Sequence, residues 1–243
     1  MTEYDKFAEL YERHFAQDFK QRVLPVLQKL LLHSLAPAAH ILELCCGPGS
    51  ITQALAERGY RLTGVDLSGP MLQLARRNVP EATFLHEDVR CFRTSGTFDA
   101  ALCFFNSFAH MLSPEDLTSA FQQVNAALKP HGTFLFDISM EEAYRTKWRG
   151  SFSRIEPDAV WICCPSYDSA QRMATNRITL FEPSNSALWS RNDFEIRQRC
   201  HSHQQILSAL KNSGFGQIEV FDAERDLDMS GEAGRSFFYA VNR

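Results

Sequence analysis

The sequence predicts an α/β fold, a mostly parallel sheet covered by helices, with an antiparallel layer inserted late in the chain. Three observations predict it. Between residues 40 and 139, apolar runs of strand length alternate with segments of helical periodicity. Between residues 145 and 200 the helical segments stop and runs of period two follow one another. The chain has 243 residues, 44% of them hydrophobic, which suits one large domain with a sizeable core.

The first 36 residues are expected to form two helices. Apolar residues recur at helical spacing over residues 3–16 and again over residues 19–35. Pro37 is expected to end the second helix, because a proline ring blocks continuation of the helical hydrogen bonds.

The alternating part of the chain follows this helical start. Strands are expected at 40–46, 60–68, 82–89, 97–107 and 132–139, and helices at 50–57, 70–78 and 114–129. Pro114 opens the last of these helices, a position where proline is favoured. Strands that alternate with helices favour a parallel sheet with crossover helices.

The inserted layer and the end of the chain complete the expected fold. The runs 158–168, 172–183 and 188–200 alternate apolar and polar residues, which indicates antiparallel strands. A helix at 202–214 ends at Gly214, and strands at 215–224 and 235–242 follow. A short polar loop joins these two strands, so we expect an antiparallel pair at the sheet edge.

Composition excludes several classes of function. The net charge of -4 gives no general basic field for nucleic acid or an anionic membrane. No apolar run approaches the roughly 18 residues that span a bilayer. The charged N-terminus lacks the apolar region of a signal peptide, so a cytoplasmic protein is expected.

The cysteines do not form a metal-binding pattern. There are seven, and no two have the spacing C-x-x-C. Cysteine also behaves as a small apolar residue. We therefore interpret Cys45 and Cys46 as the last residues of a buried strand, and we expect no metal site.

Three features lie at the carboxyl ends of the first three strands, where open α/β sheets bind ligands. Gly47 and Gly49 form a tight turn after the first strand, and glycines let the backbone approach a ligand closely. Asp66 ends the second strand, where a carboxylate can accept both hydroxyls of a ribose. Asp88 ends the third strand, where a carboxylate can accept a hydrogen bond from an adenine amino group. Together they predict a nucleoside site. Alternatively, Asp88 only caps the turn that follows it.

These motifs resemble those of class I S-adenosylmethionine-dependent methyltransferases. The run ELCCGPGS matches their first motif, GVDLS the second and HEDV the third, and the similarity covers about residues 38–138 and 203–242. The resemblance implies a Rossmann-like seven-stranded sheet with an inserted antiparallel β cap. It implies three parts: N-terminal helices (1–36) closing over the cofactor, a cofactor-binding domain (37–144 and 201–243), and a cap (145–200) over the substrate.

The same resemblance assigns the cofactor, S-adenosyl-L-methionine, and its site. The residues implied to contact it are Glu43, Cys45, Gly47 and Gly49 around the methionine part, Asp66 and Leu67 at the ribose, Asp88 and Val89 at the adenine, and Phe104 and Asn106 near the transferred methyl group. Thr52 stands where a dinucleotide-binding motif has its third glycine, which argues against an NAD-dependent oxidoreductase. A non-catalytic nucleoside-binding module is the other alternative.

The fourth-strand segment CFFNSFAHML resembles that of amino-sugar N-methyltransferases. This similarity implies that His110 is a base or orienting group and that Tyr4 closes over the cofactor. Each could instead be a packed residue. Ser107, Trp148, Arg177 and Arg199 are the candidates for contact with the substrate, although the arginines could equally face solvent.

The expected activity is methylation of a small molecule, at nitrogen (an amino sugar or a nitrogen heteroaromatic) or at oxygen. The acceptor is its expected partner, with no nucleic acid or membrane, and the protein is expected to be a monomer or homodimer.

Overall fold

The computed structural model describes residues 2–94, 98–185 and 188–243. Its main sheet has seven strands in the order β10-β11-β5-β4-β1-β2-β3. The strands are β1 (His40–Leu44), β2 (Arg61–Asp66), β3 (Thr83–His86), β4 (Phe98–Cys103), β5 (Leu128–Ser139), β10 (Phe215–Asp222) and β11 (Arg235–Asn242). β1 to β5 are parallel, whereas β11 pairs antiparallel with both β5 and β10. This confirms the predicted sheet and its antiparallel edge.

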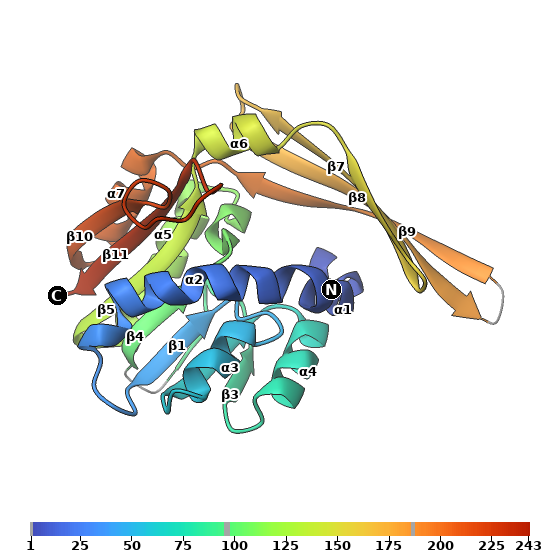
Figure 1. Cartoon of the computed structure of the whole chain (residues 1–243). Coiled ribbons are helices and arrows are strands. Elements are labelled where there is room, and N and C mark those ends of the chain that lie inside the picture. The colour runs from blue at the N-terminus through green and yellow to red at the C-terminus, as the bar shows by residue number, and fades with distance from the viewer. Residues whose placement is uncertain (1, 95–97, 186–187) are drawn as a thin grey trace.

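Helices cover both faces of the sheet (Figure 1). They are α2 (Gln17–Leu30), α3 (Ser50–Ala56), α4 (Gly69–Asn78), α5 (Pro114–Ala127) and α7 (His203–Asn212). Neighbouring residues of β1 enter different cores: Ile41 packs with α2 and α3, and Leu42 packs with α5 and α7. Side chains that alternate along a strand therefore build one core on each face. Serine side chains accept hydrogen bonds at the N-termini of α4, α5 and α7, as expected for helix caps.

The N-terminal part differs from the two predicted helices. The first is divided into a 3-10 helix η1 (Glu3–Lys6), a short α1 (Ala8–Tyr11) and a π-helix η2 (Glu12–Ala16). α2 ends at Leu30, before the expected stop at Pro37, and a 3-10 turn η3 (Leu32–Ser34) follows. Apolar spacing predicted one helix because it reports which face is buried, not how tightly the turns are wound. π-turns of this kind are often found at functional sites.

The second sheet is the predicted antiparallel layer, and we call it the cap. It has the strands β6 (Phe152–Glu156), β7 (Ala159–Asp168), β8 (Met173–Asn185) and β9 (Leu188–Arg199), in that order. β6 was not among the runs expected from the sequence. The cap extends from the main sheet as a long twisted ribbon and passes over the N-terminal segment (Figure 1). There, Trp161 and Leu180 of its inner face pack against Phe7 and Leu10.

The element before the cap was not predicted. α6 (Glu141–Lys147) crosses the expected domain boundary between residues 144 and 145. A shorter 3-10 turn, η4 (Ser107–His110), follows β4. Both elements lie beyond the carboxyl edge of the main sheet; α6 leads from β5 into the cap, and η4 contacts the cap strand β9.

Within the described ranges, no cluster of three His, Cys, Asp or Glu side chains could hold a metal ion. None of the helices described is both long and apolar enough to cross a membrane.

Candidate active site

The turn after β1 is tighter than the sequence suggested. β1 ends at Leu44, so the expectation that Cys45 and Cys46 finish the strand is wrong. Cys45 has a φ of 51°, in the left-handed region, and this turns the chain immediately after the strand. Gly49 has a φ of 79°, and a Cβ there would lie 3.2 Å from the Cβ of Ala75. The second glycine is therefore required both by conformation and by the approach of α4.

Asp66 at the end of β2 is bound to this turn. Its two carboxylate oxygens accept hydrogen bonds from the backbone N–H groups of Gly47 and Ser68, each at 2.8 Å. Burial raises the pKa of Asp66, while the hydrogen bonds from Ser68, Gly47 and Leu67 oppose that rise. Each carboxylate oxygen keeps acceptor capacity for a further donor.

Glu43 lies under the turn. Its side chain is buried and accepts a hydrogen bond from the hydroxyl of Thr52. Burial raises the pKa of Glu43 from 4.5 to about 8, with a further contribution from the charge of Asp66. Thr52, which replaces the third glycine of a dinucleotide motif, therefore holds a carboxyl group that is largely protonated at neutral pH.

The N-terminal segment covers these residues. A cavity of about 40 Å³ remains between them, and its lining includes Tyr11, Phe19, Glu43, Cys45, Gly47 and Phe104. The rings of Tyr4 and Tyr11 meet edge to face, with centroids 5.9 Å apart. Burial, and then the charge of Asp66, raises the pKa of Tyr4. Tyr4 and Tyr11 thus lie over the glycine turn.

The turn after β4 is held by buried polar groups. Phe105 and Asn106 are consecutive residues with φ values of 64° and 60°. The carboxylate of Asp137, which is fully buried and paired with Arg235, accepts from the N–H of Asn106 at 3.1 Å. The Asn106 side chain accepts from the N–H of Ser139 at 2.8 Å. Two adjacent non-glycine residues in this conformation are costly, so they persist only because these contacts hold them.

His110 lies at the end of η4, between Tyr4 and the cap. Its Nδ1 is 3.1 Å from the carbonyl oxygen of Arg197, and its Nε2 is 3.2 Å from the Tyr4 hydroxyl. A carbonyl can only accept, so Nδ1 carries the proton and Nε2 presents a lone pair. Burial lowers the pKa of His110, although the bond to Arg197 and the charge of Glu3 act in the opposite direction. The site therefore holds a neutral imidazole.

Known proteins share both the sequence and the fold. Residues 41–132 match the profile of a family described as a methyltransferase domain. A crystal structure of an S-adenosylmethionine-dependent methyltransferase from Clostridium acetobutylicum superposes with a TM-score of 0.81 and 21% identity, over 98% of each chain. A putative methyltransferase of Bacillus subtilis, YqeM, is 29% identical over 211 residues, 85% of each chain. The dTDP-3-amino-3,4,6-trideoxy-alpha-D-glucopyranose N,N-dimethyltransferase of Streptomyces venezuelae is 30% identical over 213 residues, 87% of this chain and 86% of that protein.

The chain is an S-adenosylmethionine-dependent methyltransferase. The profile match includes the glycine turn, Asp66 and His110. This assignment sets aside the oxidoreductase and the non-catalytic module that the sequence left as alternatives.

The residues at the carboxyl edge suit the methyltransferase's cofactor, S-adenosyl-L-methionine. Asp66 offers acceptor sites to a ribose diol, and the glycine turn brings backbone rather than side chains to the ligand. Asp66 supplies an acidic group near a cationic sulfonium, whereas Glu43 is largely protonated and offers a polar oxygen without a full charge. Tyr4 and Tyr11 lie over the same residues.

Several predicted residues of the methyltransferase lie away from this cluster or have other contacts. Asp88 pairs with Arg90 at 2.6 Å and accepts from the backbone N–H of Arg90 at 2.9 Å, which is the turn-capping alternative. Arg177 is exposed on the outer face of the cap, because it alternates with Ile178, which points inward. Arg199 donates to the carbonyl of Leu112 at 3.4 Å.

The remaining predicted residues differ in burial and in contacts; they are Val89, Leu67, Ser107 and Trp148. Val89 is buried, whereas Leu67 is 51% exposed beside Asp66. The hydroxyl of Ser107 donates to the carbonyl of Phe104 at 2.7 Å, within its own turn. The ring of Trp148 packs 5.4 Å from that of Tyr144, at the base of the cap.

Tyr11, Tyr144 and Gln198 also belong to this cluster, and they are not among the site residues predicted from the sequence. Gln198 is buried on the inner face of β9, and its side-chain nitrogen is 3.4 Å from Nε2 of His110. Tyr11 was visible only as one more apolar position of a helix. Gln198 falls in the period-two register of Phe194 and Ile196, which the sequence shows but which does not single it out.

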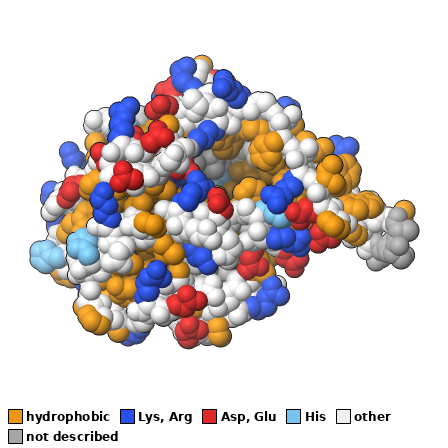
Figure 2. Space-filling view, viewed as in Figure 1, with side chains coloured by type: hydrophobic (Ala, Val, Ile, Leu, Met, Phe, Trp, Pro, Cys, Tyr) orange, Lys and Arg blue, Asp and Glu red, His pale blue; other side chains and the backbone are white. Residues whose placement is uncertain are grey.

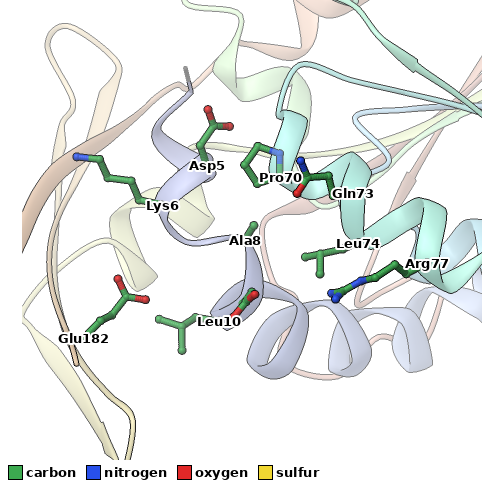
Figure 3. A pocket seen from close by; sticks show the side chains of 10 residues that line it. Asp5, Lys6, Ala8, Leu10, Pro70, Gln73, Leu74, Arg77 and Glu182 are labelled. Atoms are coloured by element: carbon green, nitrogen blue, oxygen red, sulfur yellow. The ribbon is translucent and has the colours of Figure 1, made fainter. Parts of the chain in front are cut away.

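A second cavity, of about 330 Å³, lies beside the N-terminal segment. Figure 3 shows Asp5 and Lys6 on one side, Gln73 and Arg77 of α4 on another, and Glu182 of the cap opposite them. It shares no lining residue with the cavity at the glycine turn, and its charges are of mixed sign.

Proposed function

We propose that this methyltransferase transfers a methyl group to the amino nitrogen of a small molecule, with an amino sugar as the acceptor class. One observation carries the proposal: a neutral histidine presents Nε2 between Tyr4 and the cap, close to the cofactor turn. An aliphatic amine is protonated at neutral pH and cannot attack until a base removes a proton. The Streptomyces venezuelae relative, named for N,N-dimethylation of an amino sugar, supports the acceptor class.

The proposed cofactor contacts are those that the resemblance implies. Asp66 would accept the ribose hydroxyls, with Leu67 beside it, and Glu43, Cys45, Gly47 and Gly49 would surround the methionine part. Val89 would contact the adenine, together with Asp88 once its carboxylate is released from Arg90. Phe104 and Asn106 would form the floor near the transferred methyl group.

When bound, S-adenosyl-L-methionine supplies an electrophilic methyl group on a cationic sulfur. His110 would take one proton from the acceptor ammonium onto Nε2, which frees the nitrogen lone pair for the displacement. Nδ1 keeps its proton on the carbonyl of Arg197, so the ring does not have to turn. Tyr4 would close over the cofactor and exclude water.

The acceptor would lie under the cap. The surface is hollowed between the cap and the body of the molecule, with hydrophobic side chains on its wall (Figure 2). Trp148, at the base of the cap, and Ser107, in the turn after β4, would contact the acceptor there. The N-terminal part, residues 1–36, would then act as the mobile cover on the cofactor, and residues 145–200 as the fixed cover on the acceptor.

An acceptor screen tests the proposal. The purified chain would be incubated with S-adenosyl-L-methionine and an amino sugar nucleotide, the matched sugar nucleotide with a hydroxyl in place of the amine, a nitrogen heteroaromatic and a phenol. Formation of S-adenosylhomocysteine and the mass of the product would be measured. We expect turnover with the amino sugar and none with its hydroxyl counterpart. Turnover confined to the phenol or to sugar hydroxyls would overturn the proposed acceptor class.

A further inference from the structure

A hydrogen-bond network through the side-chain amides of Asn106 and Gln198 connects the main sheet to His110. The backbone N–H of Ser139 donates to Oδ1 of Asn106 at 2.8 Å, so the Asn106 amide cannot be turned around. Its NH₂ group then faces Gln198, and Nδ2 lies 2.9 Å from Oε1 of Gln198. The hydroxyl of Tyr144 donates to the same oxygen at 3.2 Å. Two donors on one side fix the orientation of the Gln198 amide as well.

The His110 end of this network is fixed independently. With Oε1 turned toward Asn106 and Tyr144, the Gln198 NH₂ group faces His110, and the two nitrogens are 3.4 Å apart. Nδ1 of His110 donates to the carbonyl of Arg197, so Nε2 is the acceptor. The Ser139 N–H at one end and the Arg197 carbonyl at the other therefore lead to the same result. Both require that the Gln198 NH₂ group is the donor and Nε2 of His110 the acceptor.

We propose that Gln198 is a positioning residue that holds His110 as a neutral imidazole with its Nε2 lone pair directed toward the acceptor. The inference rests on the proposed function, because it gives Gln198 its role through the base. Gln198 lies on the inner face of the cap and is 7% exposed, and its amide is held at both ends. Strand β9 thus contacts both ring nitrogens, one through the Arg197 backbone and one through the Gln198 side chain.

The fixed NH₂ group of Gln198 disfavours the protonated form of the His110 ring. Once Nε2 carries a proton it becomes a donor, and it then faces a second donor that cannot rotate. The other groups that face His110 are Tyr4 and Glu3 of η1 and the backbone of Arg197. Of these only Glu3 carries a full charge, and it favours the imidazolium. Gln198 opposes it and so favours the neutral form of the ring.

The substitution Gln198→Glu tests this directly. A carboxylate of the same shape can still accept from Asn106 and Tyr144, but its other oxygen accepts from Nε2–H and stabilises the imidazolium. The histidine resonances of the full-length protein would be titrated by NMR, with His110 assigned by its loss in His110→Gln. We expect the midpoint of the His110 titration to rise by about one pH unit or more, which is about a tenfold change in the protonation equilibrium.

The matched control is Gln122→Glu, which adds the same charge at an exposed position of α5. We expect it to leave the His110 titration unchanged. If Gln198→Glu is folded and His110 titrates as in the wild type, the inference is overturned. If Gln198→Glu does not fold, Gln198→Met replaces it: loss of the opposing donor should move the titration upward by less, and no movement overturns the inference.

The same variants separate this inference from the proposed function. The acidic limb of the pH profile for kcat/KM should move upward with the titration in Gln198→Glu, which lowers kcat/KM by about tenfold at pH values below the wild-type midpoint. If the titration moves and turnover survives in His110→Gln, Gln198 controls the protonation of His110 but His110 is not the base. That result would contradict the proposed function while the NMR result stands.

Discussion

The two sides of the site are assembled in different ways. On the side proposed for the cofactor, Asp66 bonds to backbone groups 19 and 2 positions away along the chain, at Gly47 and Ser68. On the side proposed for the acceptor, His110 bonds to groups 106 and 87 positions away, at Tyr4 and Arg197. The first side is made of short motifs on consecutive parallel strands. The second exists only when the N-terminal segment, the turn after β4 and the cap come together.

Both sides nevertheless use burial to hold one titratable group without charge. Burial raises the pKa of Glu43 and keeps an acid protonated, and it lowers the pKa of His110 and keeps a base unprotonated. The consequence differs with the partner. Glu43 faces the hydroxyl of Thr52 and an acidic neighbour, whereas His110 faces oriented donors and a carbonyl. The comparison can therefore be tested one group at a time.

Glu43 should give the largest effect, and it appears in stability. Its pKa is raised from 4.5 to about 8 in the folded protein, so the folded state binds a proton that the unfolded state releases between those values. The stability contributed by the protonated group is complete below pH 4.5 and is lost as pH rises toward 8. Relative to Glu43→Gln, which keeps an acceptor for Thr52, the wild type should lose about 1.4 kcal/mol per pH unit in this window, or about 4 kcal/mol from about pH 5 to about pH 8.

Denaturant unfolding at several pH values measures that difference. Glu57→Gln, at an exposed position, serves as the control and should follow the wild type. If the free energy of unfolding changes with pH in the same way in wild type and in Glu43→Gln, Glu43 is ionised in the folded protein. The two sides would then not both hold an uncharged group.

Loss of His110 should be next in size, and it should affect turnover alone. If its Nε2 removes a proton, His110→Ala lowers kcat by about 10²-fold or more, the usual scale for a general base. Affinity for S-adenosylhomocysteine should remain near the wild-type value, because the cofactor contacts lie on the other side. Steady-state kinetics and calorimetry check both parts, with exposed His33→Ala as the control. A variant with normal kcat and reduced stability would leave His110 as a packing residue.

Asp66→Ala should show the opposite pattern, with the main effect on cofactor affinity and not on kcat. Removing one charged acceptor of two ribose hydrogen bonds should weaken S-adenosyl-L-methionine binding by about tenfold or more, at about 1.4 kcal/mol per decade. Asp18→Ala, an exposed aspartate on α2, is the matched control for loss of the charge. Calorimetry that finds unchanged affinity would remove Asp66 from the cofactor site.

The same difference in assembly explains what the sequence could predict. The parallel sheet, its antiparallel edge and the cap follow from periodicity and from motifs at strand ends, and the structure has them. The turn after β1 and its closeness to Asp66 were equally accessible, because Gly47, Gly49 and Asp66 are short-range features of consecutive strands; that they bind the cofactor stays a prediction. Periodicity could not show that Asp88 binds Arg90, since only the local conformation of that turn brings them together. Nor could it single out Gln198, whose partners come from η4, α6 and the turn after β4.

Tyr4 joins the two sides, and its hydroxyl should give the smallest effect. The ring lies over Asp66 and Cys45, while the hydroxyl donates to Nε2 of His110 at 3.2 Å. An acceptor ammonium that delivers its proton to Nε2 has to displace that hydroxyl, so the hydrogen bond is broken before the reaction and is not required for it. We therefore expect Tyr4→Phe to keep kcat and cofactor affinity within about threefold, less than the roughly 1 kcal/mol of a typical hydrogen bond. Tyr4→Ala, which removes the ring that covers the cofactor, should weaken binding of S-adenosylhomocysteine by about tenfold. Equal losses in the two variants, measured by calorimetry and steady-state kinetics, would show that the hydroxyl acts in the reaction, and the acceptor side would then extend to the N-terminal segment.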